Sequence, residues 1–237
     1  MPVTARQAGY LDALGIDRYQ PRVVVPHPAA QPQSPVTAKS APHSDPAGAW
    51  RVLAAEVAGC TACALSGTRT QTVFGVGQQD ADWLIVGEAP GAEEDACGEP
   101  FVGRAGKLLD SMLLAVGLDR RRGAYISNIV KCRPPKNRDP APAEAAACMG
   151  YLERQIALLQ PELILAVGRV AAQHLLGSEE PVGRLRGRVW HWRDTGIPLV
   201  VTYHPAYLLR SPLEKRKSWD DLCLAQEAYR QRKGPSA

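Results

Sequence analysis

Short apolar runs alternate with stretches of helical periodicity along most of the chain. Four apolar runs have the length of a buried strand, at residues 83–86, 125–130, 163–167 and 198–202, and a shorter run at 189–192 predicts an extra strand. Apolar residues at helical spacing predict helices at 50–58, 105–116, 142–159, 169–176 and 213–232. Because strands and helices alternate, we expect an α/β fold: a three-layer α/β/α sandwich around a central, mostly parallel four-stranded sheet.

The N-terminal part of the chain breaks this pattern. Residues 26–46 carry six prolines among Ala, Gln, Ser and Thr, so they cannot bury a core. We expect a disordered linker there, a short peptide at residues 1–25 and a folded domain over residues 47–233. Residues 10–22 are apolar on one side, which predicts either a docking peptide or a helix packed weakly on its own domain. They are similar to the N-terminal peptide of the psi subunit of bacterial DNA polymerase III, which implies a replication or clamp-loader partner.

Composition narrows the class of protein. Apolar residues make up 45% of the 237 residues, enough for a full core, and the net charge of +4 permits nucleic-acid binding without requiring it. The sequence has no run of eighteen apolar residues and no signal peptide, so we expect a cytoplasmic protein of bacterial type with no membrane contact. Six cysteines without an export signal favour a metal or cluster site over disulfide bonds.

A glycine-rich loop follows the first predicted strand. It begins with Gly87-Glu88-Ala89-Pro90-Gly91 and later contains Phe101. Open α/β sheets bind ligands at the carboxyl ends of their strands, and glycines let the backbone approach a ligand closely. A carboxylate, a flat ring and bare backbone amides suit a planar heterocycle better than a phosphate chain. The alternative is a tight strand-to-helix turn followed by an ordinary solvated acidic run.

Four of the cysteines have the spacing of metal ligands. Cys60 and Cys63 form a C-x2-C pair, and Cys132 and Cys148 follow far along the chain. Four thiolates suit a tetrahedral Zn²⁺ or a [4Fe–4S] cluster equally well, and four unconnected free cysteines are the alternative. Cys97 and Cys223 lie outside this set.

Several separate segments resemble one known family. GEAPGAEEDACGEPFVGRAGKLLD at residues 87–110 resembles the first motif of the family 4 uracil-DNA glycosylases, the iron–sulfur, thermostable-type branch. HPAYLLR at 204–210 resembles the second motif, and SWDDL at 218–222 matches the closing helix. The resemblance covers roughly residues 50–232 and implies a uracil-DNA glycosylase-like fold. It also implies that a structural [4Fe–4S] cluster is bound by Cys60, Cys63, Cys132 and Cys148.

The resemblance implies hydrolysis of the N-glycosidic bond of uracil in DNA after base flipping, which leaves an abasic site and starts base excision repair. Phe101 would stack on the base, and His204 would hydrogen-bond uracil O2. The amide of Asn128 offers a donor and an acceptor that match the O4 and N3–H edge of uracil, although a turn role is the alternative. Backbone amides near Ala89 would hold the base, and Glu88 would orient water or stabilise the sugar cation.

Basic and apolar residues around these motifs are expected to contact single- or double-stranded DNA. The basic loop after the second strand would reach phosphates, and leucines after His204 would fill the gap left by the flipped base. The predicted DNA contacts are Arg104, Lys131, Arg133, Lys136, Arg138, Leu208, Leu209 and Arg210.

Other functions stay open at this point. One is a non-catalytic or covalent uracil-DNA or abasic-site binder, and another is a replication-associated iron–sulfur protein without glycosylase activity. A related branch binds uracil-DNA covalently through a histidine in an inserted basic loop. This chain has no such insertion and no histidine between Gly103 and Gln173, which favours a turnover enzyme. We expect a monomer that associates with the nucleoid when it acts.

Overall fold

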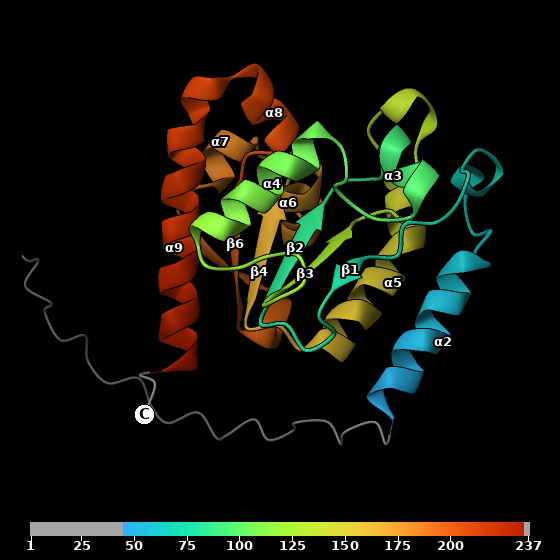
Figure 1. Cartoon of the computed structure of the whole chain (residues 1–237), viewed down its shortest axis with the longest axis horizontal. Helices are drawn as coiled ribbons and strands as arrows, with labels where there is room; N and C mark the ends of the chain where they lie inside the picture. The colour runs from blue at the N-terminus through green and yellow to red at the C-terminus, as the bar shows by residue number, and fades with distance from the viewer. Residues whose placement is uncertain (1–44, 235–237) are drawn as a thin grey trace, which may run out of the picture. The chain divides into compact units, whose positions relative to one another are not determined.

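A six-stranded sheet forms the centre of the computed structural model, which describes residues 45–234 (Figure 1). The strand order is β1-β3-β2-β4-β6-β5. The strands are β1 Val76–Gly77, β2 Trp83–Gly87, β3 Ala124–Asn128, β4 Leu163–Val167, β5 Val189–Trp192 and β6 Ile197–Thr202. The four central strands are parallel, as predicted, and the extra strand predicted at 189–192 is β5. Antiparallel β1 and β5 extend the two edges of the sheet, and β1 was not predicted.

Alternation along the buried strands divides the apolar residues between two cores. In β2, Leu84 and Val86 face one core, whereas Trp83 and Ile85 face the other. Successive side chains of a strand point to opposite faces, so a strand that is apolar throughout is buried on both. Each face of the sheet therefore needs its own layer of helices.

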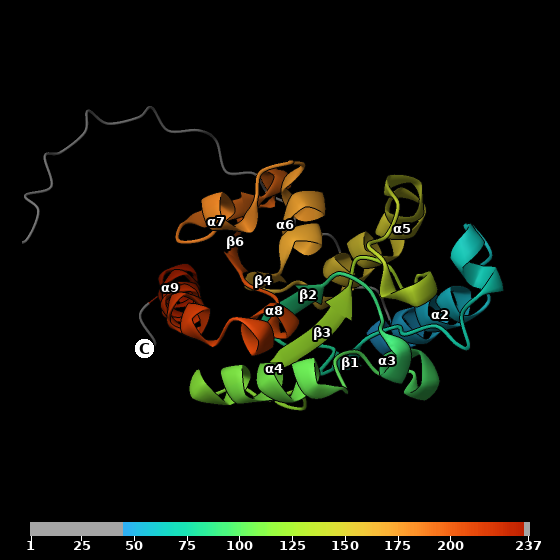
Figure 2. The ribbon, with the colours of Figure 1, turned by 90° about the horizontal axis from the view of Figure 1, so that it is seen from above.

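The helices form these two layers (Figure 2). One face is covered by α2 Pro46–Ala58, α5 Pro142–Leu159, α6 Arg169–Leu176 and α7 Val182–Leu185. The other is covered by α4 Arg104–Ala115, α8 Pro205–Arg210 and α9 Lys215–Lys233. A short helix, α3 Ala92–Cys97, precedes α4, and the 3-10 turns are η1 Ala64–Gly67, η2 Pro135–Asn137, η3 Arg193–Thr195 and η4 Pro212–Glu214. The predicted three-layer sandwich is thus confirmed.

The folded part begins slightly earlier than predicted. The Asp45 side chain accepts a hydrogen bond from the Gly48 N–H at 2.9 Å and caps α2. The helix starts at Pro46, one residue before the predicted start of the domain at residue 47. Residues 1–44 lie outside the described residues, and so do the predicted docking peptide and most of the linker. Across residues 45–234, none of the helices combines the length and the hydropathy needed to span a bilayer.

Candidate active site

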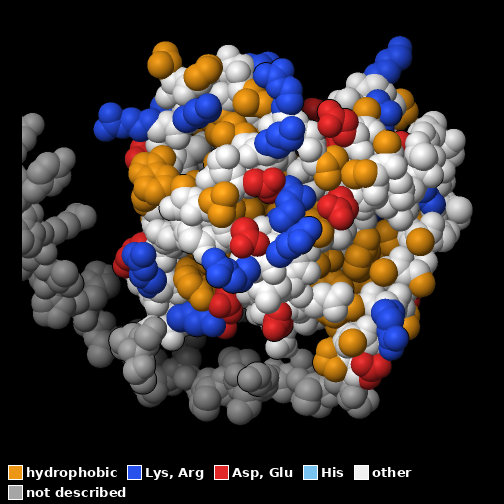
Figure 3. All heavy atoms as spheres, viewed as in Figure 1, with side chains coloured by type: hydrophobic (Ala, Val, Ile, Leu, Met, Phe, Trp, Pro, Cys, Tyr) orange, Lys and Arg blue, Asp and Glu red, His pale blue; other side chains and the backbone are white. Residues whose placement is uncertain are grey.

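A cleft of about 880 Å³ lies at the carboxyl ends of the four parallel strands. Each strand contributes a lining residue: Glu88 follows β2, Asn128 ends β3, Gly168 follows β4 and His204 follows β6. The strand arrows point to this end in Figure 1, and Figure 3 shows Lys and Arg side chains along it. The predicted position of a ligand site therefore coincides with this cleft.

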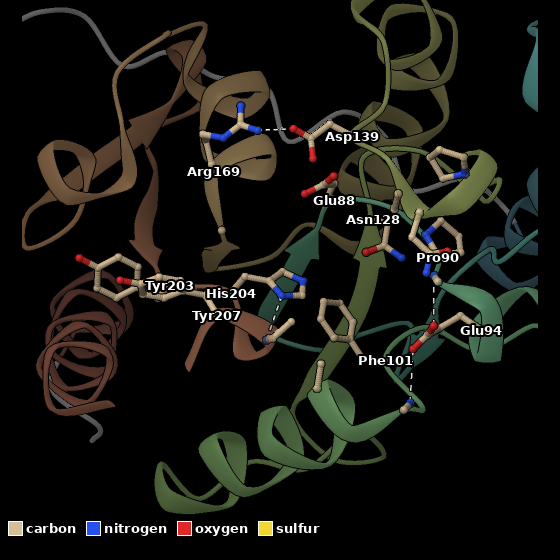
Figure 4. A pocket seen from close by; sticks show the side chains of 18 of the residues that line it. Glu88, Pro90, Glu94, Phe101, Asn128, Asp139, Arg169, Tyr203, His204 and Tyr207 are labelled. Carbon is tan, nitrogen blue, oxygen red and sulfur yellow. Dashed lines mark hydrogen bonds and ion pairs between the residues drawn. The ribbon is translucent and has the colours of Figure 1, made fainter. Parts of the chain in front are cut away.

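Phe101, Asn128 and His204 come together on one wall of the cleft (Figure 4). The Phe101 ring stacks against the His204 ring, with centroids 5.6 Å apart and planes 30° from parallel. The side-chain oxygen of Asn128 is buried and accepts no hydrogen bond within the described protein. A buried polar atom without a partner costs free energy, so a ligand that donates a hydrogen bond to this oxygen would remove that cost.

Two glycines stand at positions where a Cβ would collide with Phe101 or Asn128. A Cβ on Gly87 would lie 2.4 Å from Asn128 Oδ1 and 2.5 Å from Phe101 Cζ. A Cβ on Gly106 would lie 1.7 Å from the Phe101 carbonyl oxygen. Phe101 itself has a φ of 55°, which is unusual for a residue with a side chain. The loop is thus strained at Phe101, and it packs directly onto glycine backbone.

His204 is held in one tautomer. Its Nδ1 accepts a hydrogen bond from the Ala206 N–H at 3.1 Å, so the ring proton of the neutral imidazole lies on Nε2. Desolvation, with a smaller effect from Arg210, lowers the pKa of His204 to about 4. At neutral pH the side chain is therefore an uncharged hydrogen-bond donor.

Glu88 stands beside a second carboxylate. Burial, followed by the charge and the hydrogen bond of Asp139, raises the pKa of Glu88 to about 7, and the positive charge of Arg169 partly opposes this. Arg169 in turn forms an ion pair with Asp139 (Figure 4). A carboxyl group with a pKa near neutrality can accept a proton at physiological pH.

The acidic run after Gly91 is not the solvated segment considered as an alternative. Glu94 accepts hydrogen bonds from the N–H groups of Gly91 at 3.1 Å and Val102 at 3.0 Å, and it ties α3 to the loop that carries Phe101. Asp95 is buried and accepts from the Thr70 N–H at 2.9 Å. These two carboxylates stabilise the conformation of the loop.

The prediction that Lys131 contacts DNA is wrong. Its side chain is only 1% exposed, and its ammonium donates to Ser127 Oγ at 2.6 Å, Asn128 O at 2.8 Å and Gln155 Oε1 at 2.7 Å. The residue lies just after β3, where the chain turns inward between the sheet and α5. Lys131 therefore stabilises the backbone of Asn128 from inside the protein.

The prediction for Leu208 is also wrong. HPAYLLR forms a short helix, α8, rather than a loop, since Pro205 occupies its first turn and His204 caps it. Leu208 is 1% exposed and packs in the core under α4 and α9, because it points to the inner side of this helix. Leu209 is half-buried and Arg210 is exposed, so both stay available for DNA.

The other predicted basic residues lie around the cleft, and they differ in exposure and in whether another side chain already binds them. Arg104 is exposed at the start of α4, and Arg138 lines the cleft but donates to both carboxylate oxygens of Glu144. Arg133 donates to Asn137 Oδ1 at 2.7 Å, and Lys136 is exposed in the same loop. Ala89 also lines the cleft.

The four predicted cysteine ligands line one small cavity between α2, η1 and α5. Within residues 45–234, no three His, Cys, Asp or Glu side chains are arranged to hold a single metal ion. The four cysteines therefore share one cavity, although they are far apart in the sequence.

Donors surround the cysteine sulfur atoms. Arg69 Nη1 donates to Cys132 Sγ at 3.1 Å, and the Lys131 N–H donates to Cys148 Sγ at 3.3 Å. Burial raises the pKa of both thiols, while Arg69 and Lys131 act in the opposite direction. This donor set fits a negatively charged thiolate group.

Comparisons with known proteins add to this geometry. The family model described as "Uracil DNA glycosylase superfamily" matches residues 74–224. A type-4 uracil-DNA glycosylase of Archaeoglobus fulgidus is 44% identical over 163 residues, which are 66% of this chain and 81% of that relative. The chain belongs to this superfamily, in its type-4 branch.

Other relatives belong to the type-4 branch and, with lower identity, to the type-5 branch. A type-4 uracil-DNA glycosylase of Thermotoga maritima is 44% identical over 68% of this chain and 83% of its own length. A type-5 uracil-DNA glycosylase of Thermus thermophilus is 36% identical over 56% of this chain and 68% of its own length. The resemblance of the sequence motifs to the family 4 uracil-DNA glycosylases is therefore confirmed.

Within this type-4 glycosylase, the structure adds cleft residues that the sequence interpretation did not single out. Asp139 and Arg169 face Glu88, and Tyr203 and Tyr207 line the side of the cleft near α8. Asp139 follows the basic loop, and Arg169 follows a strand. These positions along the chain are the sequence signals that could have identified the two residues. Only the fold shows that they meet.

Proposed function

We propose that this protein removes uracil from DNA as a monofunctional uracil-DNA glycosylase and leaves an abasic site. The observation that carries the proposal is the unpartnered Asn128 oxygen, which faces a cleft beside Phe101 and His204 in a chain of the type-4 branch. The substrate is uracil-containing DNA, and the reaction begins base excision repair.

Recognition of the base depends on stacking against Phe101 and on hydrogen bonds with the side-chain amide of Asn128. A base inside a duplex is out of reach, so the uracil nucleotide must leave the helix to enter the cleft. Phe101 gives the base an aromatic face, and Asn128 donates to O4 and accepts from N3–H. Cytosine has the reverse pattern of donor and acceptor at these two positions, so its hydrogen bonds cannot form.

Bond cleavage rests on His204 and Glu88. As the bond between C1′ and N1 breaks, its electron pair moves onto the uracil ring. The Nε2–H of neutral His204 stabilises the negative charge at O2. Water attacks C1′ of the sugar cation, and Glu88 orients this water and accepts its proton. The uracil anion takes up a proton from solvent, to which Glu88 returns the proton of the water, so the products are free uracil and a sugar with a hydroxyl at C1′.

The cysteine cavity is assigned to a [4Fe–4S] cluster bound by Cys60, Cys63, Cys132 and Cys148. When bound, the cluster supplies a cross-link between distant segments rather than chemistry on DNA. It joins the chain after α2 to the end of β3 and to α5. Arg69 and Lys131 balance the negative charge of the thiolates.

Duplex DNA is expected to lie across the basic end of the molecule. Arg104, Arg133, Lys136 and Arg210 would contact phosphates, and Arg138 would do so while paired with Glu144. Leu209 is the remaining candidate to fill the gap left by the flipped base. A replication or clamp-loader partner for residues 10–22 and a cytoplasmic site of action stay predictions.

The test is uracil release from a single-uracil oligonucleotide by purified full-length protein, with substrate in tenfold excess over enzyme. Turnover is expected for the wild type, and His204→Ala should lower the rate by about 100- to 1,000-fold, the usual loss for one such donor. Cys97→Ser, whose thiol is exposed outside the cleft, is the control and should keep full rate. A wild-type protein that binds uracil-DNA without releasing uracil would overturn the proposal in favour of a binding protein.

A further inference from the structure

Glu88, Asp139 and Arg169 form a chain of charged groups from three different segments of the cleft wall (Figure 4). Glu88 follows β2, Asp139 lies in the loop before α5, and Arg169 is the first residue of α6. The carboxyl group of Glu88 interacts with Asp139, and Asp139 is ion-paired with Arg169. Folding brings these residues together although Glu88 and Arg169 are far apart in the sequence.

Stability alone does not explain two carboxyl groups placed side by side. Like charges in contact repel, so one of the pair retains a proton to a higher pH than an isolated carboxyl group would. Arg169 is paired with Asp139 rather than with Glu88, so the negative charge is favoured on Asp139 and the proton on Glu88. The partly exposed Arg169–Asp139 pair contributes little to stability by itself.

We propose that Asp139, held by Arg169, is a positioning residue that sets the pH range in which Glu88 acts as a base on the attacking water. The proposal rests on the proposed glycosylase function, and it adds a residue that sets the pH dependence of that function. Asp139 acts on Glu88 through its charge and a hydrogen bond, and thus through the orientation and protonation of that carboxyl group.

The proton balance of hydrolysis fits this arrangement. One O–H bond of the attacking water breaks as the oxygen bonds to C1′, and the proton moves to Glu88. The protonated Glu88 then donates a hydrogen bond to the Asp139 carboxylate, which gives the transferred proton a favourable place. Departure of the product and return of the proton to solvent restore the ionised pair. A base works best when its pKa lies near the working pH.

Other charges around the cleft do not replace Asp139. The charges that act on Glu88 are Asp139 from the loop before α5 and Arg169 from α6. His204 in the same cleft is uncharged at neutral pH. The remaining charged residues that line the cleft are Glu93, Glu94, Arg104, Arg138 and Arg210. Glu94 is engaged by backbone N–H groups, and Arg138 by Glu144.

The experiment is a pH profile of single-turnover uracil release at saturating protein, for wild type, Asp139→Asn and Arg169→Gln. The wild-type rate should rise with pH through about 7, since ionised Glu88 is the active form. Asp139→Asn removes a negative neighbour and should move the rise to lower pH. Arg169→Gln removes the positive neighbour and should move it to higher pH. Glu153→Gln breaks a remote surface ion pair with Arg193 and is the control, with an unchanged profile.

Opposite shifts distinguish this role from a structural one, because two substitutions that merely loosened the same ion pair would change the rate in the same direction. Infrared titration of the Glu88 carboxyl group, identified by its loss in Glu88→Gln, gives a readout independent of activity and should show the same two shifts. If the wild type releases uracil but both profiles and both titrations match it, the inference is wrong. If the wild type releases no uracil, the proposed function fails instead.

Discussion

Asn128 shows how one residue connects fold to specificity. Its side chain is 2% exposed at the end of β3, its backbone carbonyl is held by Lys131, and its amide oxygen has no partner in the described protein. Burial keeps the amide in one orientation, and the missing partner leaves an acceptor directed at the cleft. A base that offers no donor there would leave this oxygen desolvated and unpaired.

Asn128→Asp should lower uracil excision by about 100-fold or more, since a carboxylate has no donor for uracil O4. It should also allow a trace of cytosine excision, because the carboxylate can accept from the cytosine amino group. The measurement is single-turnover release of each base at pH 8 with saturating protein. Gln231→Glu makes the same amide-to-acid change on the exposed surface of α9, outside the cleft, and is the control that should retain the wild-type rate. Wild-type excision by Asn128→Asp would show that this residue does not read the base.

Much of the residue-scale site could be predicted because each residue follows a recognisable strand or motif. Phe101, Asn128 and His204 meet in the cleft, as expected. Lys131 was misassigned because a basic residue in a basic loop gives no sign that its side chain turns inward. Asp139 was missed because its contact with Glu88 depends on the loop conformation, which no periodicity encodes.

At the scale of elements, α8 presents two leucines in opposite environments. Leu208 packs in the core, and its neighbour Leu209 is half-buried. Consecutive residues of a helix point about 100° apart, so one short helix can anchor itself and still present an apolar side chain. Substitutions of these two leucines therefore give a matched test of whether Leu209 fills the gap left by the flipped base.

Leu209→Ala should reduce uracil release from duplex DNA more than from single-stranded DNA, where no stack has to be opened. Leu208→Ala should instead lower the free energy of unfolding by about 2–5 kcal/mol and affect both substrates alike. Rates on the two substrates and a denaturant titration separate the effects. Equal losses on both substrates for Leu209→Ala would place this leucine with the core as well.

Lys131 and Lys136 belong to one loop but differ as the two leucines do, since Lys131 is buried and Lys136 is exposed. Lys136→Ala should lower the slope of log K against log salt for DNA binding by about one, as expected for one lost phosphate contact. Lys131→Met should leave the slope unchanged but destabilise the fold by about 3 kcal/mol, because buried acceptors lose their donor. Binding isotherms at several salt concentrations decide between them. A slope that falls for Lys131→Met would return Lys131 to the DNA surface.

Long elements could be predicted at this scale and short ones could not. The bounds of α5 and β4 agree with the sequence pattern, since each spans enough residues to show its period. The short helices α3, α7 and α8 complete fewer than two turns, so no periodicity identifies them. Strand β1 has two residues and depends on pairing with β3.

At the scale of the whole molecule, the cysteine cavity brings together segments that are far apart in the sequence. The segment after α2 supplies Cys60 and Cys63, whereas Cys132 follows β3 directly. The helix α2 also packs on α5, and Glu56 pairs with Arg154 across that contact. A cluster in the cavity would fasten the first helix to the sheet.

The purified protein should therefore be brown, with broad visible absorbance that bleaches on oxidation. Cys132→Ser and Cys148→Ser should lose this absorbance and much of their solubility, whereas Cys97→Ser should keep both. Iron and sulfide analysis of anaerobic preparations provides the measurement. A colourless protein with one zinc per chain would contradict the cluster assignment.

Removal of residues 1–44 should leave uracil release from short oligonucleotides unchanged, because the described fold starts at Asp45. Removal of residues 1–46 takes away the Asp45 cap and should cost about 1 kcal/mol of stability. Melting curves and activity of both truncations test this. A large loss of activity on removing 1–44 would make the N-terminal segment part of the catalytic body.

The close contacts at Gly87 and Gly106 have a consequence for how the enzyme can diverge. Where a pocket wall is made of flexible side chains, many small changes can reshape it gradually. Here any added side chain at Gly87 or Gly106 meets Phe101 or Asn128 at once, so this part of the wall cannot change in small steps. Gly87 and Gly106 should therefore stay unchanged in active variants selected from a library for a new base preference.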